Sequence, residues 1–241
     1  MKIEFCLPVY NESLILQKNL DALLNYCEKQ NFSFDWQVII IVNGSSTEFE
    51  NLAFQIAQKQ PSQVKTIIYK EKGRGQAVKK YWLSSLADIL VYMDVDLAVS
   101  LDNIPNLINP IIQNTHDLTI GSRMMPGSKR DRSLAREASS QIYVLLSRLI
   151  LKHDYSDLQC GFKGIRRSFF EKIAPKIKDN FWFFDTELIY FTKESQGRIL
   201  EIPVNWSENR FGFRKSKVNV FRDSLLFIQK LIELRLRKKI D

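Results

Sequence analysis

Residues 88–96 of the 241-residue chain read Asp-Ile-Leu-Val-Tyr-Met-Asp-Val-Asp. The apolar run over Asp88–Met93 predicts a buried strand, and two carboxylates follow at its carboxyl end. Residues two apart on an extended segment point the same way, so the side chains of Asp94 and Asp96 can converge. Carboxylate oxygens suit Mg²⁺ or Mn²⁺, and such ions commonly bind phosphate oxygens as well. The pair predicts a metal site, with two solvated acids at a strand end as the alternative.

Strand and helix patterns alternate on the amino-terminal side of this stretch. Apolar and β-branched runs predict three further strands, over Lys2–Leu7, Trp36–Val42 and Val64–Tyr69. Helical patterns lie between the strands, over Glu12–Gln30, Glu48–Lys59 and Gly75–Leu86. This rhythm predicts an α/β fold with a mostly parallel central sheet flanked by helices. In open sheets of this kind, ligands bind just outside the carboxyl ends of the strands, where Asp94 and Asp96 are expected.

The carboxyl-terminal half has a less regular pattern. Short strands are expected over Leu118–Ile120, Gly161–Ile165 and Ile199–Val204. Helices are expected over Ala135–Leu151, Thr186–Glu194 and Val218–Ile240. The segment Pro126–Ser133 is rich in Gly, Ser, Lys, Arg and Asp, and this composition predicts a mobile basic loop.

Composition limits the partners and the compartment. Lysine and arginine exceed the acids by 35 to 27, giving a formal charge of +8 that suits nucleotides, anionic lipid or nucleic acid. Three widely spaced cysteines form no disulfide framework, and Met1–Leu7 is too short and too charged for a signal peptide. No apolar run approaches the roughly 20 residues of a membrane-spanning helix. We therefore expect a cytoplasmic chain whose membrane contact is peripheral.

Two further segments follow predicted strands and precede predicted helices. Residues 8–12 read Pro-Val-Tyr-Asn-Glu. The tyrosine ring can stack on a base, and the glutamate can bind a ribose. The alternative is a turn between strand and helix, with Asn11 as the helix N-cap. Residues 72–77, Lys-Gly-Arg-Gly-Gln-Ala, place two glycines at a helix start, which favours an anion; the alternative is a flexible basic turn. Phosphate-binding P-loop, dinucleotide-binding and nucleophile-elbow motifs are absent from the sequence.

Taken together, the segments resemble the family 2 glycosyltransferases of the GT-A fold, specifically the dolichyl- or polyprenyl-phosphate sugar synthases. The resemblance runs in family order over positions 8 to 217, through residues 8–12, 72–78, 94–96, 121–123, 157–163, 184–188 and 201–206. The segments 157–163 and 184–188, together with Ala98, are most similar to the dolichyl-phosphate glucosyltransferase branch. The mannosyl branch usually has Gln where Ala98 stands.

The resemblance implies a donor site for a nucleoside-diphosphate sugar and a divalent cation, Mg²⁺ or Mn²⁺. Asp94 would meet the ribose or diphosphate, and Asp96 would hold the cation. The residues that would border the nucleotide sugar are Pro8, Tyr10, Glu12, Asn43, Lys72, Gly73, Gly75 and Lys217. Asn43 departs from the family, which usually has an acidic pair there; its amide can still bond a base, but with donors that a carboxylate lacks.

The resemblance also implies an acceptor, a polyprenyl or dolichyl phosphate, that Arg123 and Arg136 would bind through their guanidiniums. Direct attack by the phosphate oxygen would invert the anomeric configuration. Asp185 is a candidate base only if the acceptor is a hydroxyl; its structural alternative is a helix N-cap before Thr186. A mannosyl-type synthase, a transferase to a glycan hydroxyl and a non-catalytic membrane- or partner-binding protein are the rival functions.

The chain divides by pattern into a glycosyltransferase domain, residues 1–217, and a basic amphipathic helix, residues 218–241. The helix carries one apolar stripe: Val218, Phe221, Leu225, Ile228 and Ile232. It can lie on the cytoplasmic face of a membrane that carries anionic lipid, or it can pack on the domain. A nucleic-acid partner is not expected, because no nucleic-acid-binding module is present.

Overall fold

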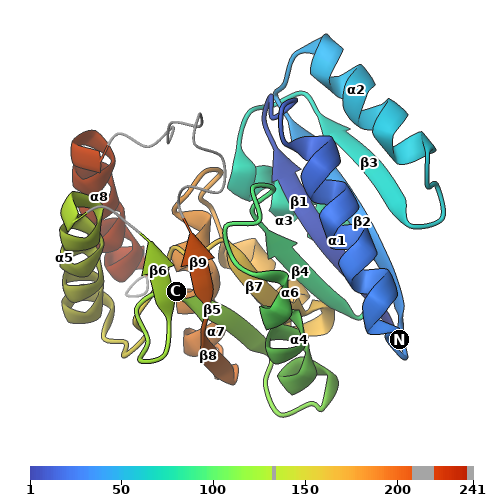
Figure 1. Ribbon diagram of the computed structural model, residues 1–241. Helices are drawn as coiled ribbons and strands as arrows, with labels where there is room; N and C mark the ends of the chain where they lie inside the picture. The colour runs from blue at the N-terminus through green and yellow to red at the C-terminus, as the bar shows by residue number, and fades with distance from the viewer. Residues whose placement is uncertain (132–133, 208–219, 238–241) are drawn as a thin grey trace.

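The computed structural model describes residues 1–131, 134–207 and 220–237 of the chain. A seven-stranded sheet with the order β3-β2-β1-β4-β7-β5-β8 forms its centre (Figure 1). The strands are β1 (Lys2–Val9), β2 (Asp35–Asn43), β3 (Val64–Tyr69), β4 (Ile89–Met93), β5 (Leu118–Ser122), β7 (Phe162–Arg166) and β8 (Ile199–Pro203). Only β7 runs antiparallel to its neighbours β4 and β5. The predicted mostly parallel α/β sheet is confirmed.

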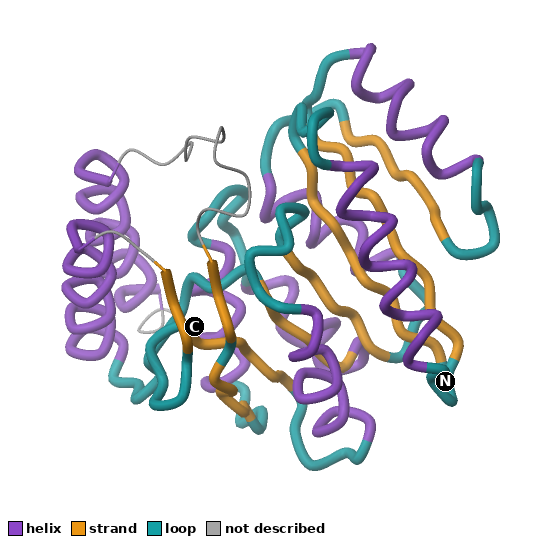
Figure 2. Tube along the Cα trace, viewed as in Figure 1, coloured by secondary structure: helices purple, strands orange, loops and turns teal. Residues whose placement is uncertain are grey.

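Helices cover both faces of this sheet (Figure 2). One core lies under α1 (Leu16–Gln30), α2 (Thr47–Gln58) and α4 (Ile104–Ile112). The other core lies under α3 (Arg74–Ser84), α6 (Arg167–Ile173) and α7 (Phe184–Glu194). Adjacent residues of β1 serve opposite cores, Phe5 the first and Cys6 the second, because successive side chains of a strand alternate between faces. The sheet is therefore buried on both sides, as a parallel sheet requires.

The prediction of a basic loop over Pro126–Ser133 is wrong for its central residues. Residues Lys129–Asp131 form strand β6, which pairs in parallel with β9 (Asn205–Ser207) in a separate two-stranded sheet. Short charged strands at the edge of a domain lack the apolar alternation that marks a strand in sequence, which explains the error. Short 3-10 turns lie over Leu101–Asn103 and Ala174–Lys176.

The last helix, α8 (Val220–Arg237), packs on the domain beside α5 (Leu134–Leu151), and Figure 1 shows the pair at one end of the molecule. Leu231 and Leu234 are fully buried, and the Phe227 ring lies 5.4 Å from that of Tyr143 on α5. Leu226, Ile232 and Leu236 of α8 remain about half exposed. The packing alternative is therefore confirmed for one face of the helix. Of the described helices, none is long and apolar enough to span a bilayer.

Candidate active site

Asp94 lies at the carboxyl end of β4, as predicted, and an arginine holds its side chain. Arg74, the first residue of α3, places Nη2 3.2 Å from Oδ1 of Asp94. Gly161 lies so close that a Cβ there would fall 2.1 Å from Oδ2 of Asp94. Burial raises the pKa of Asp94, as do the carboxylates of Asp96 and Asp185, while Arg74 opposes the shift. The site therefore gathers negative charge around a carboxylate that is still 40% exposed.

Asp96 follows at a turn that begins beside Asp94. Leu97 adopts a left-handed φ of 49°, and its N–H donates to the Asp94 carbonyl at 3.0 Å. Oδ1 of Asp96 accepts the N–H of Ala98 at 3.2 Å. Among the described residues, no three acidic, histidine or cysteine side chains form a complete metal site. The Asp94 carboxylate occupies the place that a Cβ on Gly161 would take. Together with Asp96 it fits a divalent cation that takes its remaining ligands from a diphosphate and water.

Asp185 is buried in the first turn of α7 and accepts hydrogen bonds from two elements of the sheet. The Tyr92 hydroxyl donates to its Oδ1 at 2.5 Å, and Nζ of the fully buried Lys163 donates to the same oxygen at 2.6 Å. Arg74 Nη2 lies 3.5 Å from the other oxygen. The predicted alternative, that Asp185 is the N-cap of the helix, is wrong: Phe183 holds the N-cap position, and Asp185 is the second residue of α7. Asp185 is linked to Asp94 through Arg74.

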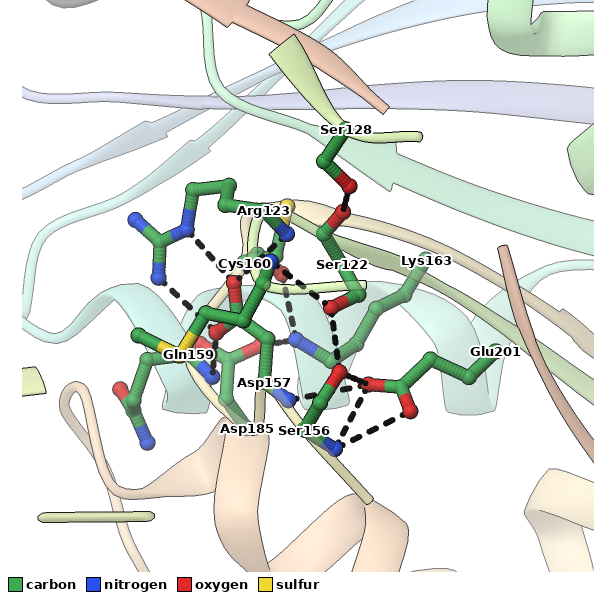
Figure 3. A network of polar contacts seen from close by, with 11 residues as sticks. Ser122, Arg123, Ser128, Ser156, Asp157, Gln159, Cys160, Lys163, Asp185 and Glu201 are labelled. Carbon is green, nitrogen blue, oxygen red and sulfur yellow. Dashed lines mark hydrogen bonds and ion pairs between the residues drawn. The ribbon is translucent and has the colours of Figure 1, made fainter. Parts of the chain in front are cut away.

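Arg123 makes a two-pronged ion pair with Asp157 (Figure 3). Its Nε lies 2.6 Å from Oδ2 of Asp157 and its Nη2 lies 2.9 Å from Oδ1. Burial disfavours the charged form of Asp157, but Arg123 outweighs it and holds the pKa of that carboxyl below its usual range. Glu201 on β8 accepts the N–H groups of Ser156 and Asp157 at 2.9 Å, which anchors the loop. The guanidinium predicted for the acceptor phosphate is thus oriented by a buried carboxylate.

Asn43 ties together the ends of β1 and β2 and the turn before α3. Its buried amide donates to the Val9 carbonyl at 2.8 Å, and its oxygen accepts the Gly73 N–H at 3.4 Å. Lys72 places its ammonium 4.2 Å from the centre of the Tyr10 ring. The three predicted donor-site segments, after β1, after β2 and before α3, therefore meet at one edge of the sheet. Direct contact of Asn43 with a base stays a prediction.

The two glycines before and within α3 have close protein neighbours. A Cβ on Gly73 would lie 2.7 Å from the Asn180 carbonyl, and one on Gly75 would lie 2.4 Å from Cβ of Phe184. Packing against the segment before α7 thus accounts for both. Asn11 is not a helix N-cap, because its Oδ1 accepts the N–H of Ser46 at 3.0 Å and α1 begins only at Leu16. The roles of Pro8, Glu12, Gly73 and Gly75 toward a nucleotide stay predictions.

Two predicted residues fall outside what the structure describes. Arg136 lies on α5, but its side chain is outside the described ones, and Lys217 lies outside the described residues. Sequence reasoning missed Arg74, Lys163 and Asp157 as members of the site. All three stand inside the quoted motif segments, but a buried ion pair between distant segments has no signature in one sequence.

A doubly covered, mostly parallel sheet with paired carboxylates at the end of β4 defines the class of GT-A glycosyltransferases. Residues 4–174 match the profile described as glycosyl transferase family 2, and the chain belongs to this family.

Known relatives cover nearly the whole chain. It is 30% identical over 225 residues to glycosyltransferase AglD of Haloferax volcanii, matching 93% of this chain but only 35% of that protein. It is 27% identical over 241 residues to the dolichyl-phosphate beta-glucosyltransferase of Dictyostelium discoideum, covering 95% of this chain and 72% of the relative. The human dolichyl-phosphate beta-glucosyltransferase is 28% identical over 248 residues, at 98% and 75% coverage.

A solved structure supports the fold. Glucosyl-3-phosphoglycerate synthase from Mycobacterium tuberculosis, crystallised with Mn²⁺, UDP-glucose and phosphoglyceric acid, superposes with a TM-score of 0.66. The match covers 98% of this chain and 79% of that one at 15% identity. Similarity at this level of sequence identity shows a shared fold and nothing more.

Proposed function

We propose that this chain transfers one sugar, with inversion, from a nucleoside-diphosphate sugar resembling UDP-glucose to a polyprenyl or dolichyl phosphate. The observation that carries the proposal is the pair Asp94 and Asp96 at the carboxyl end of β4, where open α/β sheets bind their ligands. The names of the dolichyl-phosphate beta-glucosyltransferase relatives supply the acceptor class and the sugar.

Asp94 and Asp96 would hold Mg²⁺ or Mn²⁺ together with the diphosphate of the donor. A bound cation would supply Lewis-acid stabilisation of the negative charge that grows on the leaving diphosphate. The crystallised neighbour with Mn²⁺ and UDP-glucose supports this choice of ligands by analogy of fold.

The acceptor phosphate has to be oriented, but it does not need a strong base to activate it. A phosphate oxygen is anionic near neutral pH, so it can attack the anomeric carbon without losing a proton. The bond from this oxygen to the sugar forms as the bond to the diphosphate breaks, which inverts the configuration. Arg123, held by Asp157, would orient the phosphate, with Arg136 as its predicted partner. Asp185 lies behind Arg74, bonded to Tyr92 and Lys163, which favours an electrostatic role over that of a base.

The membrane side of the proposal concerns α8. Its half-exposed Leu226, Ile232 and Leu236 point away from the face that Leu231 and Leu234 bury, and basic residues accompany them in the sequence. We propose that this outer face meets a membrane with anionic lipid, at its cytoplasmic side. Flotation with vesicles of phosphatidylserine and phosphatidylcholine tests this contact, and its loss in Ile232→Glu is the expected result.

Donor and acceptor profiling tests the reaction itself. The chain is incubated with UDP-glucose, GDP-mannose and a short polyprenyl phosphate, and the products are identified by mass. A hexosyl polyprenyl phosphate from UDP-glucose supports the proposal. A product from GDP-mannose alone favours the mannosyl alternative, and a product only with a glycan acceptor favours the hydroxyl transferase. Absence of any product with every pair would favour a non-catalytic protein.

A further inference from the structure

Residues 178–184, which lead into α7 and include its first residue, place aromatic side chains beside the candidate active site; we call them the aromatic segment. Phe181 and Trp182 are 48% and 43% exposed, whereas Phe183 and Phe184 are buried. The guanidinium of Arg74 lies 4.4 Å from the centre of the Trp182 ring, within the range of a cation–π contact. Because the same guanidinium pairs with Asp94, Trp182 is separated from the candidate metal site by one side chain.

Two buried carboxylates hold the backbone of the aromatic segment. Oδ1 of Asp179 accepts the N–H groups of Phe181 at 2.7 Å and of Phe184 at 3.2 Å. Oε2 of Glu187 accepts the N–H groups of Lys178 and Asp179, both at 2.7 Å. Each carboxylate therefore uses one oxygen to fix two backbone donors, which sets the path of the segment across α3.

The second oxygen of each carboxylate forms an ion pair with a basic side chain of α8. Lys230 pairs with Oδ2 of Asp179, and Arg237 pairs with Oε1 of Glu187. The carboxylates are buried, with side chains only 6% and 1% exposed. A buried carboxylate needs a positive partner to stay charged, so removal of either cation should loosen the segment that the same carboxylate holds. The Phe227 ring of α8, 5.8 Å from that of Phe183, adds an apolar contact to the same connection.

We propose that Lys230 and Arg237 are positioning residues for the active site, acting through Asp179 and Glu187 on the aromatic segment. The segment in turn fixes Trp182 over Arg74, and Arg74 fixes the Asp94 carboxylate. Besides packing on α5, α8 thus supports the donor side of the site through carboxylates that lie 51 and 50 residues before its cations in sequence. The inference rests on the proposed function only in treating Asp94 as a donor-site residue.

Quenching of Trp182 fluorescence by acrylamide tests the connection directly. The chain has four tryptophans, so each variant is measured with and without Trp182→Phe, and the difference isolates Trp182. In Lys230→Met the quenching constant of Trp182 should rise, and Lys230→Arg should restore it toward the wild-type value. Gln229→Met, at the neighbouring position, is the matched control: the Gln229 amide donates to Glu233 on the exposed side of α8, so its loss should leave the quenching constant of Trp182 unchanged. If Lys230→Met does not fold, the double variant Asp179→Ala/Lys230→Met removes both charges and also the oxygen that accepts the Phe181 and Phe184 N–H groups, and it should show the same rise.

Calorimetry with UDP in the presence of Mn²⁺ gives the second measurement. Lys230→Met and Arg237→Met should weaken binding about threefold or more, within the two- to thirtyfold range of couplings through packed networks. Gln229→Met should bind as wild type does. Unchanged Trp182 quenching in a folded Lys230→Met or double variant would overturn the proposal. A wild-type chain that binds no UDP would instead contradict the proposed function, while the quenching result still decides the role of Lys230.

Discussion

Arg74 Nη2 lies 3.2 Å from the carboxylate of Asp94, and the same nitrogen lies 3.5 Å from the carboxylate of Asp185. One guanidinium thus contacts both the partly exposed acid of the site and the buried acid behind it, and Lys163 supplies the second positive charge. Arg74 also lies over the Tyr92 ring, so the pair is held by packing as well as by charge. This contact explains how acids can gather around Asp94 in the folded chain.

Replacement of Arg74 by Met should destabilise the fold. Asp185 would keep Lys163 but lose one cation, and Asp94 would lose its partner in a region that already raises its pKa. A buried ion pair broken on one side costs about 3–5 kcal/mol, and the partial exposure of Asp94 reduces this to about 1–3 kcal/mol. Urea unfolding measures the loss. A variant as stable as the wild type would show that Asp185 does not need Arg74.

Asp157→Asn should loosen Arg123 without removing it. The guanidinium keeps its charge but loses the carboxylate that fixes its orientation. We expect the KM for polyprenyl phosphate to rise about tenfold, the scale of one charge-assisted hydrogen bond, while affinity for the nucleotide alone stays within a few-fold. Arg123→Lys should lose activity in the same direction, since lysine lacks the planar fork. Equal loss of nucleotide binding would place Arg123 on the donor side.

Asn43→Asp should lower stability while restoring the family's acid. The amide that donates to the Val9 carbonyl is replaced by a second acceptor in a buried position. An unsatisfied buried carbonyl costs about 1–3 kcal/mol, which urea unfolding would detect. We also expect a sharper preference for uridine over guanosine diphosphate sugars. If the folded variant loses uridine binding instead, Asn43 does not lie against the base.

His153 should make stability depend on pH between about 6.5 and 4. Burial lowers its pKa to about 4, and the nearby charges of Lys193 and Arg148 act in the same direction. Its Nδ1 has no hydrogen-bond partner among the described residues, so the folded chain favours the neutral ring. Below pH 6.5 the unfolded chain binds a proton that the folded chain does not, and stability falls by at most about 1.4 kcal/mol per pH unit.

The difference between the wild type and His153→Gln isolates this contribution. Glutamine can keep a hydrogen bond to Ser147, which the ring makes at 3.0 Å, but it does not titrate. Urea unfolding at pH 7.5 and pH 5 should show a smaller decrease in the variant. Equal decreases in both proteins would mean that His153 is protonated in the folded chain.

The alternating first half of the fold is predictable because each strand and helix carries its own apolar period. Helix α4 escaped prediction although Ile104, Leu107, Ile108 and Ile111 have helical spacing and are fully buried. Pro105 and Pro110 disguise it, yet the first lies where a helix needs no N–H donor and the second lies in the last turn. The antiparallel direction of β7 is also set by its place between β4 and β5, which no local pattern encodes.

The candidate site was also predictable only in part. Asp94 and Asp96 were predictable because their position follows from the end of one strand. The partners that hold the site come from distant segments: Asp157 lies 34 residues from Arg123, and Asp185 lies 22 residues from Lys163. Such pairs depend on how the elements pack, so one sequence reveals the motif but not the contact.

Sugar transfer by Asp96→Asn, measured beside transfer by the wild type, tests whether Asp96 holds the cation that the proposed reaction needs. Both proteins are incubated with UDP-glucose, a short polyprenyl phosphate and saturating Mg²⁺ or Mn²⁺, and the product is measured by mass. The asparagine keeps the size and the oxygen that accepts the Ala98 N–H, so the unfolding profile should stay close to wild type. We expect a glucosyl polyprenyl phosphate from the wild type and almost none from Asp96→Asn. Equal product from a folded Asp96→Asn would contradict it.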